Sequence, residues 1–184
     1  MITRDEALTL INKYIREKKN FRTSLAIEAI LKKLARRLGE DEEIWGLTGL
    51  LHNIDYEYTV EDQQKRGVLS AQLLDGLLPK EVINAIRANS YINTDYLPET
   101  PLDKALISAE STACLIFATL GASYTHSIED IDIMLLFENF KDASFASDCN
   151  RDRIKLCNHI EMTVKEFLSL CLDAIQDIQN TIEI

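Results

Sequence analysis

Hydrophobic positions recur at helical spacing along most of the chain. Over residues 24–38, for example, apolar side chains return every three or four positions. Thr3, Thr100 and Thr163 each stand three residues before an acid, a pattern typical of the first turn of a helix. The pattern and its punctuation predict helices at about 3–15, 24–38, 41–52, 61–77, 79–88, 100–120, 127–139, 150–158 and 163–179, with an irregular segment at 89–99.

Residues that interrupt helices are scarce. The 184 residues include only 6 glycines and 3 prolines, and the sequence contains no convincing strand, repeat or low-complexity linker. Chains usually divide into domains only beyond roughly 250 residues. The sequence therefore predicts an all-α protein with one compact domain over residues 1–184.

Charge is distributed unevenly. The formal net charge is −10, yet the first 40 residues contain ten Lys and Arg against five Asp and Glu. An acidic body repels phosphate backbones, so we expect no general nucleic-acid binding. The basic stretch around Lys18 and Lys19 is either a solvated helix end or a meeting point for an anionic ligand.

The sequence also bears on membranes and cellular location. No uninterrupted apolar run approaches the roughly 18 residues of a membrane helix, and the first residues lack the apolar core of a signal peptide. The cysteines show no CxxC spacing. We therefore expect a cytoplasmic protein without a membrane partner. Its cysteines are expected to be reduced, buried thiols: Cys114, Cys149, Cys157 and Cys171.

One segment carries a resemblance to a known family. Residues 45–57 read Trp-Gly-Leu-Thr-Gly-Leu-Leu-His-Asn-Ile-Asp-Tyr-Glu and follow the basic amphipathic segment 24–39. This combination, with later segments at 140–146 and 150–154, resembles the HD superfamily of metal-dependent phosphohydrolases, in particular small bacterial HDIG-type hydrolases. The resemblance covers about residues 20–175 and implies a compact HD-domain-like helical bundle.

The resemblance also implies where a metal site would lie. The family takes a histidine from an early helix, an adjacent His-Asp pair and a late aspartate, and many members add two histidines. On this sequence the early histidine falls on Thr23, the pair on His52-Asn53, the optional histidines on or near Arg66 and Asn89, and the aspartate on Glu110. Only His52 is an unchanged ligand.

These replacements argue against the family's reaction. Outer-shell changes alone cost about 10- to 100-fold, so losing an inner histidine and a carboxylate costs roughly 10⁴-fold or more. Asn53 is neutral, and the positive charge of Arg66 repels a divalent cation. We expect no catalytic residue and no cofactor, and predict that the former metal-site positions bind a small anionic ligand or a protein partner. A homodimer stays open.

Two alternatives are kept. The first is a weak or atypical phosphohydrolase, acting on a nucleotide or other phosphate ester, in which His52 and Glu110 hold a divalent metal ion. The second is an interaction module whose pocket is filled. For Arg66 two positions stay open: it pairs with an acid of the pocket such as Glu110, or it lies on an exposed helix face. Four acids near the motif form a relocated metal site or have structural roles: Asp55, Glu57, Glu61 and Asp62.

Overall fold

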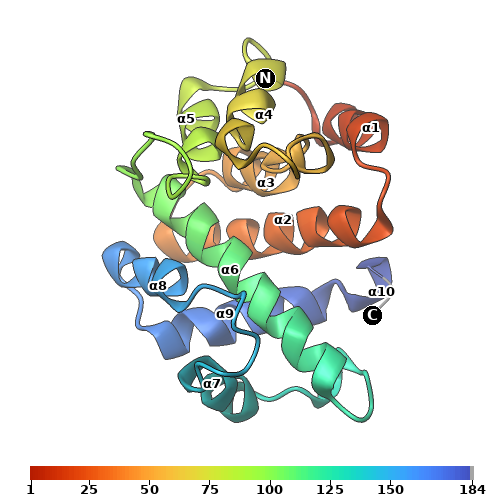
Figure 1. Cartoon of the computed structure of the whole chain (residues 1–184), viewed down its shortest axis with the longest axis vertical. Helices are drawn as coiled ribbons and strands as arrows, with labels where there is room; N and C mark the ends of the chain where they lie inside the picture. The colour runs from red at the N-terminus through yellow and green to blue at the C-terminus, as the bar shows by residue number, and fades with distance from the viewer. Residues whose placement is uncertain (183–184) are drawn as a thin grey trace.

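The structure, a computed structural model, describes residues 1–182. This part of the chain contains helices and no strand, which confirms the all-α prediction (Figure 1). The α-helices are α1 (Arg4–Tyr14), α2 (Lys18–Leu38), α3 (Glu42–Leu51), α4 (Val68–Leu74), α5 (Lys80–Ala88), α6 (Pro101–Ala122), α7 (Ile133–Lys141), α8 (Arg151–Ile154), α9 (Val164–Asp177) and α10 (Gln179–Ile182). Four 3-10 helices join them: η1 (Tyr56–Tyr58), η2 (Gln63–Lys65), η3 (Ile128–Asp130) and η4 (Lys155–Ile160).

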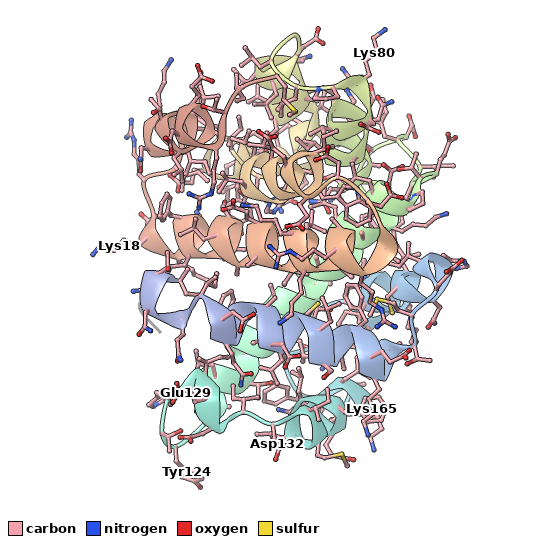
Figure 2. All side chains as sticks on the ribbon, turned by 180° about the vertical axis from the view of Figure 1, so that it is seen from behind. Lys18, Lys80, Tyr124, Glu129, Asp132 and Lys165 are labelled. Atoms are coloured by element: carbon pink, nitrogen blue, oxygen red, sulfur yellow. A yellow bond between two sulfur atoms is a disulfide. The ribbon has the colours of Figure 1, made fainter. Side chains whose placement is uncertain are left out.

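Helix α2 is the central element of the packing. It crosses the middle of the molecule, with α1, α3, α4 and α5 on one side and α9 on the other, while α6 runs across it (Figure 1). The view from behind shows α9 extending alongside α2 (Figure 2). Leu, Ile and Ala side chains from all these helices form a buried hydrophobic cluster. The segments that flank α2 and α6 are thereby held in fixed positions.

Helices α2 and α3 approach each other closely at Gly49. A Cβ atom at Gly49 would lie 2.6 Å from the Ile27 carbonyl oxygen and 2.8 Å from the Glu28 backbone nitrogen. Real Cβ atoms essentially never come so near to backbone. The glycine therefore sets the depth at which the end of α3, with His52 as its C-cap, sits against α2.

Helix starts agree with the sequence where the capping residue is local. Thr3, Thr100 and Thr163 all form capping boxes, as predicted. Helix α2 begins at Lys18, earlier than expected. There the Glu57 carboxylate accepts hydrogen bonds from two backbone N–H groups, those of Arg16 and Glu17, at 2.9–3.1 Å. A negative charge near the start of a helix interacts favourably with the helix dipole. Here the charge comes from Glu57, about forty positions away in the chain.

Two predicted helices are interrupted. The helix expected at 61–77 is instead η2 followed by α4, because Gly67 adopts φ 75° and breaks the run. A Cβ at Gly67 would lie 2.5 Å from the Ile86 carbonyl oxygen, so only glycine fits there. The helix expected at 127–139 is also divided, because Asp132 caps α7 by accepting the Leu135 N–H after the short η3.

Helix α6 has the length and hydropathy of a helix that crosses a membrane. Its mean hydropathy over 18 residues is 1.5, and 61% of that stretch is buried inside the domain. The core helix of a soluble protein has the same properties, so this finding is weak support for a membrane span. The sequence contains no uninterrupted apolar run here, because Asp103, Lys104 and Glu110 divide the apolar residues.

The prediction of four reduced, buried thiols is wrong for one pair. Cys114 on α6 and Cys149 before α8 form a disulfide, with Cα atoms 5.7 Å apart. Cys114 is also exposed, because it faces away from the α6 core side, whereas Cys157 and Cys171 are buried free thiols as expected. A spacing of 35 residues gives no local signal of such a pair.

We predict that Gly49→Ala weakens the fold through the α2–α3 contact. The added methyl must displace backbone, so the free energy of unfolding should fall by about 1–3 kcal/mol in urea denaturation. Gly121→Ala is the matched control, because its Cβ meets nothing within 4 Å. On α6 that change should be neutral or stabilising by up to ~1 kcal/mol. Equal effects of the two substitutions would contradict the role given to Gly49.

Candidate functional site

A pocket of about 650 Å³ lies between α2, α6 and the segments around η1 and α8. Three of the predicted site positions line it: Thr23, Asn53 and Glu110. Their sequence neighbours Tyr56 and Ser111 also line the wall, and Arg153 joins them from a distant part of the chain. The fold therefore brings the early-helix, His-Asp-pair and late-helix positions to one cavity.

His52 lies behind this wall with its ring fully buried. Its Nδ1 is 2.7 Å from the Gly49 carbonyl oxygen, which can only accept a hydrogen bond, so Nδ1 carries the hydrogen. Nε2 therefore presents a lone pair, and it has no hydrogen-bond partner within residues 1–182. Burial disfavours the imidazolium and lowers the pKa of His52, which keeps the ring neutral.

Two polar residues of the pocket wall are engaged with α2. The Ser24 hydroxyl donates to Asn53 Oδ1 at 2.8 Å, in a buried position. The Thr23 hydroxyl donates to the Lys19 carbonyl oxygen at 3.0 Å, within its own helix. At the two positions where the family resemblance implies a histidine and an aspartate, the chain thus has polar groups already used in structural hydrogen bonds.

The dominant feature of the site is the guanidinium of Arg153. Its Nη2 donates to Glu110 Oε2 at 2.5 Å and to Asn89 Oδ1 at 3.0 Å, and its Nη1 donates to the Asn89 carbonyl oxygen at 2.7 Å. Its Nε donates to Ser111 Oγ at 2.9 Å. The Arg153 side chain is 11% exposed and that of Glu110 is 29% exposed, so this is a partly buried ion pair in which most of the guanidinium donors are satisfied.

Arg66 does not take the position predicted for it. Its guanidinium lies over the Tyr56 ring, 4.4 Å from the centroid, and Arg66 does not line the pocket. Arg153 makes the expected arginine–acid pair with Glu110 instead. The cause is the backbone: Arg66 ends η2 in an extended conformation before the left-handed Gly67, which directs the chain toward α5.

The acids that follow the motif have structural roles or face solvent. Asp55 is buried, and its Oδ2 accepts the backbone N–H groups of Gly67 and Ser70 at 2.7 and 2.9 Å, which caps α4. Burial raises the pKa of Asp55. Glu57 binds the start of α2, Glu61 is exposed, and Asp62 pairs with Lys65. These carboxylates point to different elements, so they do not assemble the relocated metal site.

The donors present do not fit a divalent ion of the family's type. The two candidate ligand atoms that remain, His52 Nε2 and Glu110 Oε1, are 3.8 Å apart. Within residues 1–182, no group of three or more His, Cys, Asp or Glu side chains is placed to hold a metal. The second Glu110 oxygen is bonded to Arg153, whose fixed charge would repel a cation.

Comparison with known proteins identifies no relative: no family model, no curated protein and no solved structure matches the chain. The resemblance to the HD superfamily therefore stays a prediction from the sequence.

His126 and His159, which lie outside the motif, are both exposed and distant from His52 in the chain. Sequence analysis also missed Arg153. Its only local signal is the pair of arginines in Asn150-Arg-Asp-Arg, after an Asn that caps α8.

We predict that Arg153→Ala destabilises the protein much more than Arg66→Ala. The first change leaves Glu110 without its partner and removes hydrogen bonds to Asn89 and Ser111, at a cost of about 2–3 kcal/mol. The second removes a stacking contact with Tyr56, at a cost of about 0.5–1 kcal/mol. Urea unfolding of both variants measures the difference. A larger loss for Arg66→Ala would contradict the assignment of Arg153 as the central cation.

Proposed function

We propose that this chain is a catalytically lapsed relative of the HD-type phosphohydrolases that binds a small anionic ligand in the pocket between α2, α6 and α8. The observation that carries the proposal is the Arg153–Glu110–Asn89 network. It lies at the positions where the family resemblance implies a metal. A guanidinium there compensates the Glu110 charge permanently, as an ion would, but it brings no activated water and no Lewis acid.

The size of the pocket supports a small-molecule ligand. At about 650 Å³ it falls within the range of ligand sites in proteins, roughly 300–1,000 Å³. This volume argues against the alternative in which the pocket is filled. The walls combine polar groups with the apolar surfaces of Phe117 and Ala118. Such a mixture is usual where a few polar groups orient a ligand.

Charge at the pocket mouth supports an anionic ligand. A second hollow of about 340 Å³, which we call the pocket mouth, shares Lys19, Thr23 and Phe117 with the pocket. It adds Arg22 and His126, but no acid. The inner pocket contains Glu110 paired with Arg153, a pair that is neutral overall, and a second acid, Asp148. In a chain of net charge −10, this mouth is a local cationic surface, and Lys19 belongs to both hollows.

The alternative function is a weak metal-dependent phosphohydrolase. The lone pair of His52 Nε2 facing Glu110 Oε1 is the observation that favours it. Two donors are fewer than the three or more that catalytic metals usually have, and Arg153 opposes the ion. We therefore rank this function second.

We predict that inorganic phosphate, pyrophosphate or a nucleoside monophosphate stabilises the protein in a thermal-shift titration. A ligand present at 100 times its Kd adds about 2.7 kcal/mol to the stability of the folded state. Lys19→Ala should weaken that effect. Lys18→Ala is the matched control, because Lys18 does not line the pocket and extends away from the body (Figure 2).

Three outcomes would contradict the proposed function. If none of these anions raises the melting temperature, or if Lys18→Ala weakens the effect as much as Lys19→Ala, the ligand is not an anion held at this mouth. If manganese-dependent phosphate release appears and His52→Gln abolishes it, the chain is an enzyme and the alternative is correct.

A further inference from the structure

The disulfide between Cys114 and Cys149 forms part of the pocket wall. Cys114 is on the exposed face of α6, whereas Cys149 is 3% exposed and immediately precedes Asn150, the N-cap of α8. A reagent in the pocket therefore reaches Cys114 more readily than Cys149. The two cysteines differ in access although they share one bond.

The disulfide and the Arg153 network join the same two segments, one turn apart. On α6, Cys114 comes four residues after Glu110, and before α8, Cys149 comes four residues before Arg153. Ser108 Oγ adds a third contact by donating to the Arg153 carbonyl oxygen at 3.1 Å. The covalent link thus fixes the point where α8 begins, and α8 in turn positions the cation.

The loop that carries Cys149 is held together independently of the disulfide. The Arg151 guanidinium donates to the carbonyl oxygens of several residues between the end of α7 and α8, including Phe145, Ala146 and Cys149, at 2.5–2.7 Å. Further bonds go to Asn139 and Asp142. Breaking the disulfide therefore leaves the loop folded around Arg151 but removes its covalent attachment to α6.

We propose that the Cys114–Cys149 disulfide is a thiol-exchange site, at which a low-molecular-weight thiol releases this wall of the pocket from α6. The thiolate attacks Cys114 Sγ, the S–S bond breaks, and the electron pair goes to Cys149 Sγ, which takes up a proton from water. A second thiolate then attacks the thiol-derived sulfur of the mixed disulfide, and Cys114 leaves as a thiolate that is protonated. The protein gains two electrons, and two thiols become one disulfide.

The other two cysteines do not compete for this exchange. Cys157 and Cys171 are buried, and burial raises the pKa of Cys157 to about 12 and that of Cys171 well above its ordinary value. Both stay protonated at neutral pH, and the thiolate is the reactive form. Exchange is therefore confined to the pair in the pocket wall. Disulfides that are exposed on one side are typically the ones with regulatory lability.

The first test is a peptide map of the full chain, alkylated with iodoacetamide at lysis and digested without reductant. We expect a linked peptide pair containing Cys114 and Cys149. Alkylation of both cysteines in protein kept in air would overturn the proposal. Limiting reduced glutathione should then give a mixed disulfide on Cys114, and an adduct on Cys149 would overturn the assignment of the attacked sulfur.

The second test is hydrogen exchange of the same protein before and after reduction. Amides of residues 142–153 should exchange about tenfold faster in the reduced form, while those of α9 should be unchanged because the core stays folded. The double variant Cys114→Ser with Cys149→Ser should show the fast exchange without a thiol, and Cys157→Ala should keep the response. Equal exchange in oxidised and reduced protein would overturn the proposal. Neither readout requires the anionic ligand, so failure here and failure of the proposed function are distinguishable.

Discussion

The partly buried ion pair between Arg153 and Glu110 is the interaction on which the rest of the site depends. It joins α8 to α6, and the same guanidinium binds both the side chain and the backbone of Asn89 at the end of α5. Three segments far apart in the sequence thus meet at one cation. The Glu110 side chain is 29% exposed, and its partner is covalently part of the chain rather than an ion from solution.

The pairing of Glu110 with an arginine is consistent with the hydrogen bonding and charge of the neighbouring residues. With a guanidinium on one Glu110 oxygen, a divalent ion would lie beside a fixed positive charge that repels it. Asn53 and Thr23 make structural hydrogen bonds in place of ligation, and His52 is kept neutral by burial. Under the proposed function, the replacement of the family's His-Asp ligands and the presence of an internal cation are two parts of one change.

The positions of Arg151 and Arg153 connect the site to the pocket wall. The two side chains come from one short helix but bond to different parts of the fold. Arg151 donates to the carbonyl oxygens of its own loop, and Arg153 donates to residues at the end of α5 and on α6. Helix α8 itself spans only Arg151–Ile154. Its position therefore depends on these contacts and on the neighbouring disulfide rather than on helix propensity. The segment around α8 thus forms part of the pocket wall and also carries the Arg153 guanidinium.

Much of the fold followed from local sequence signals, and the site followed only in part. Helices capped by their own threonines were predicted, because the cap and its partner are three residues apart. The early start of α2 was missed, because the residues just before it are held by Glu57, about forty positions away. Thr23, Asn53 and Glu110 do share a pocket, but the arginine beside them was placed at Arg66 instead of Arg153. A single sequence gives no signal for a pair separated by 43 residues.

The central claim is that an internal guanidinium has replaced the metal ion that the family resemblance implies. Elemental analysis by mass spectrometry, on protein purified without chelator and without a metal-affinity tag, tests it most directly. The account predicts that manganese, iron, cobalt, nickel and zinc are all present at far below one ion per chain. One tightly held ion per chain, lost in Glu110→Gln and in His52→Gln, would contradict it.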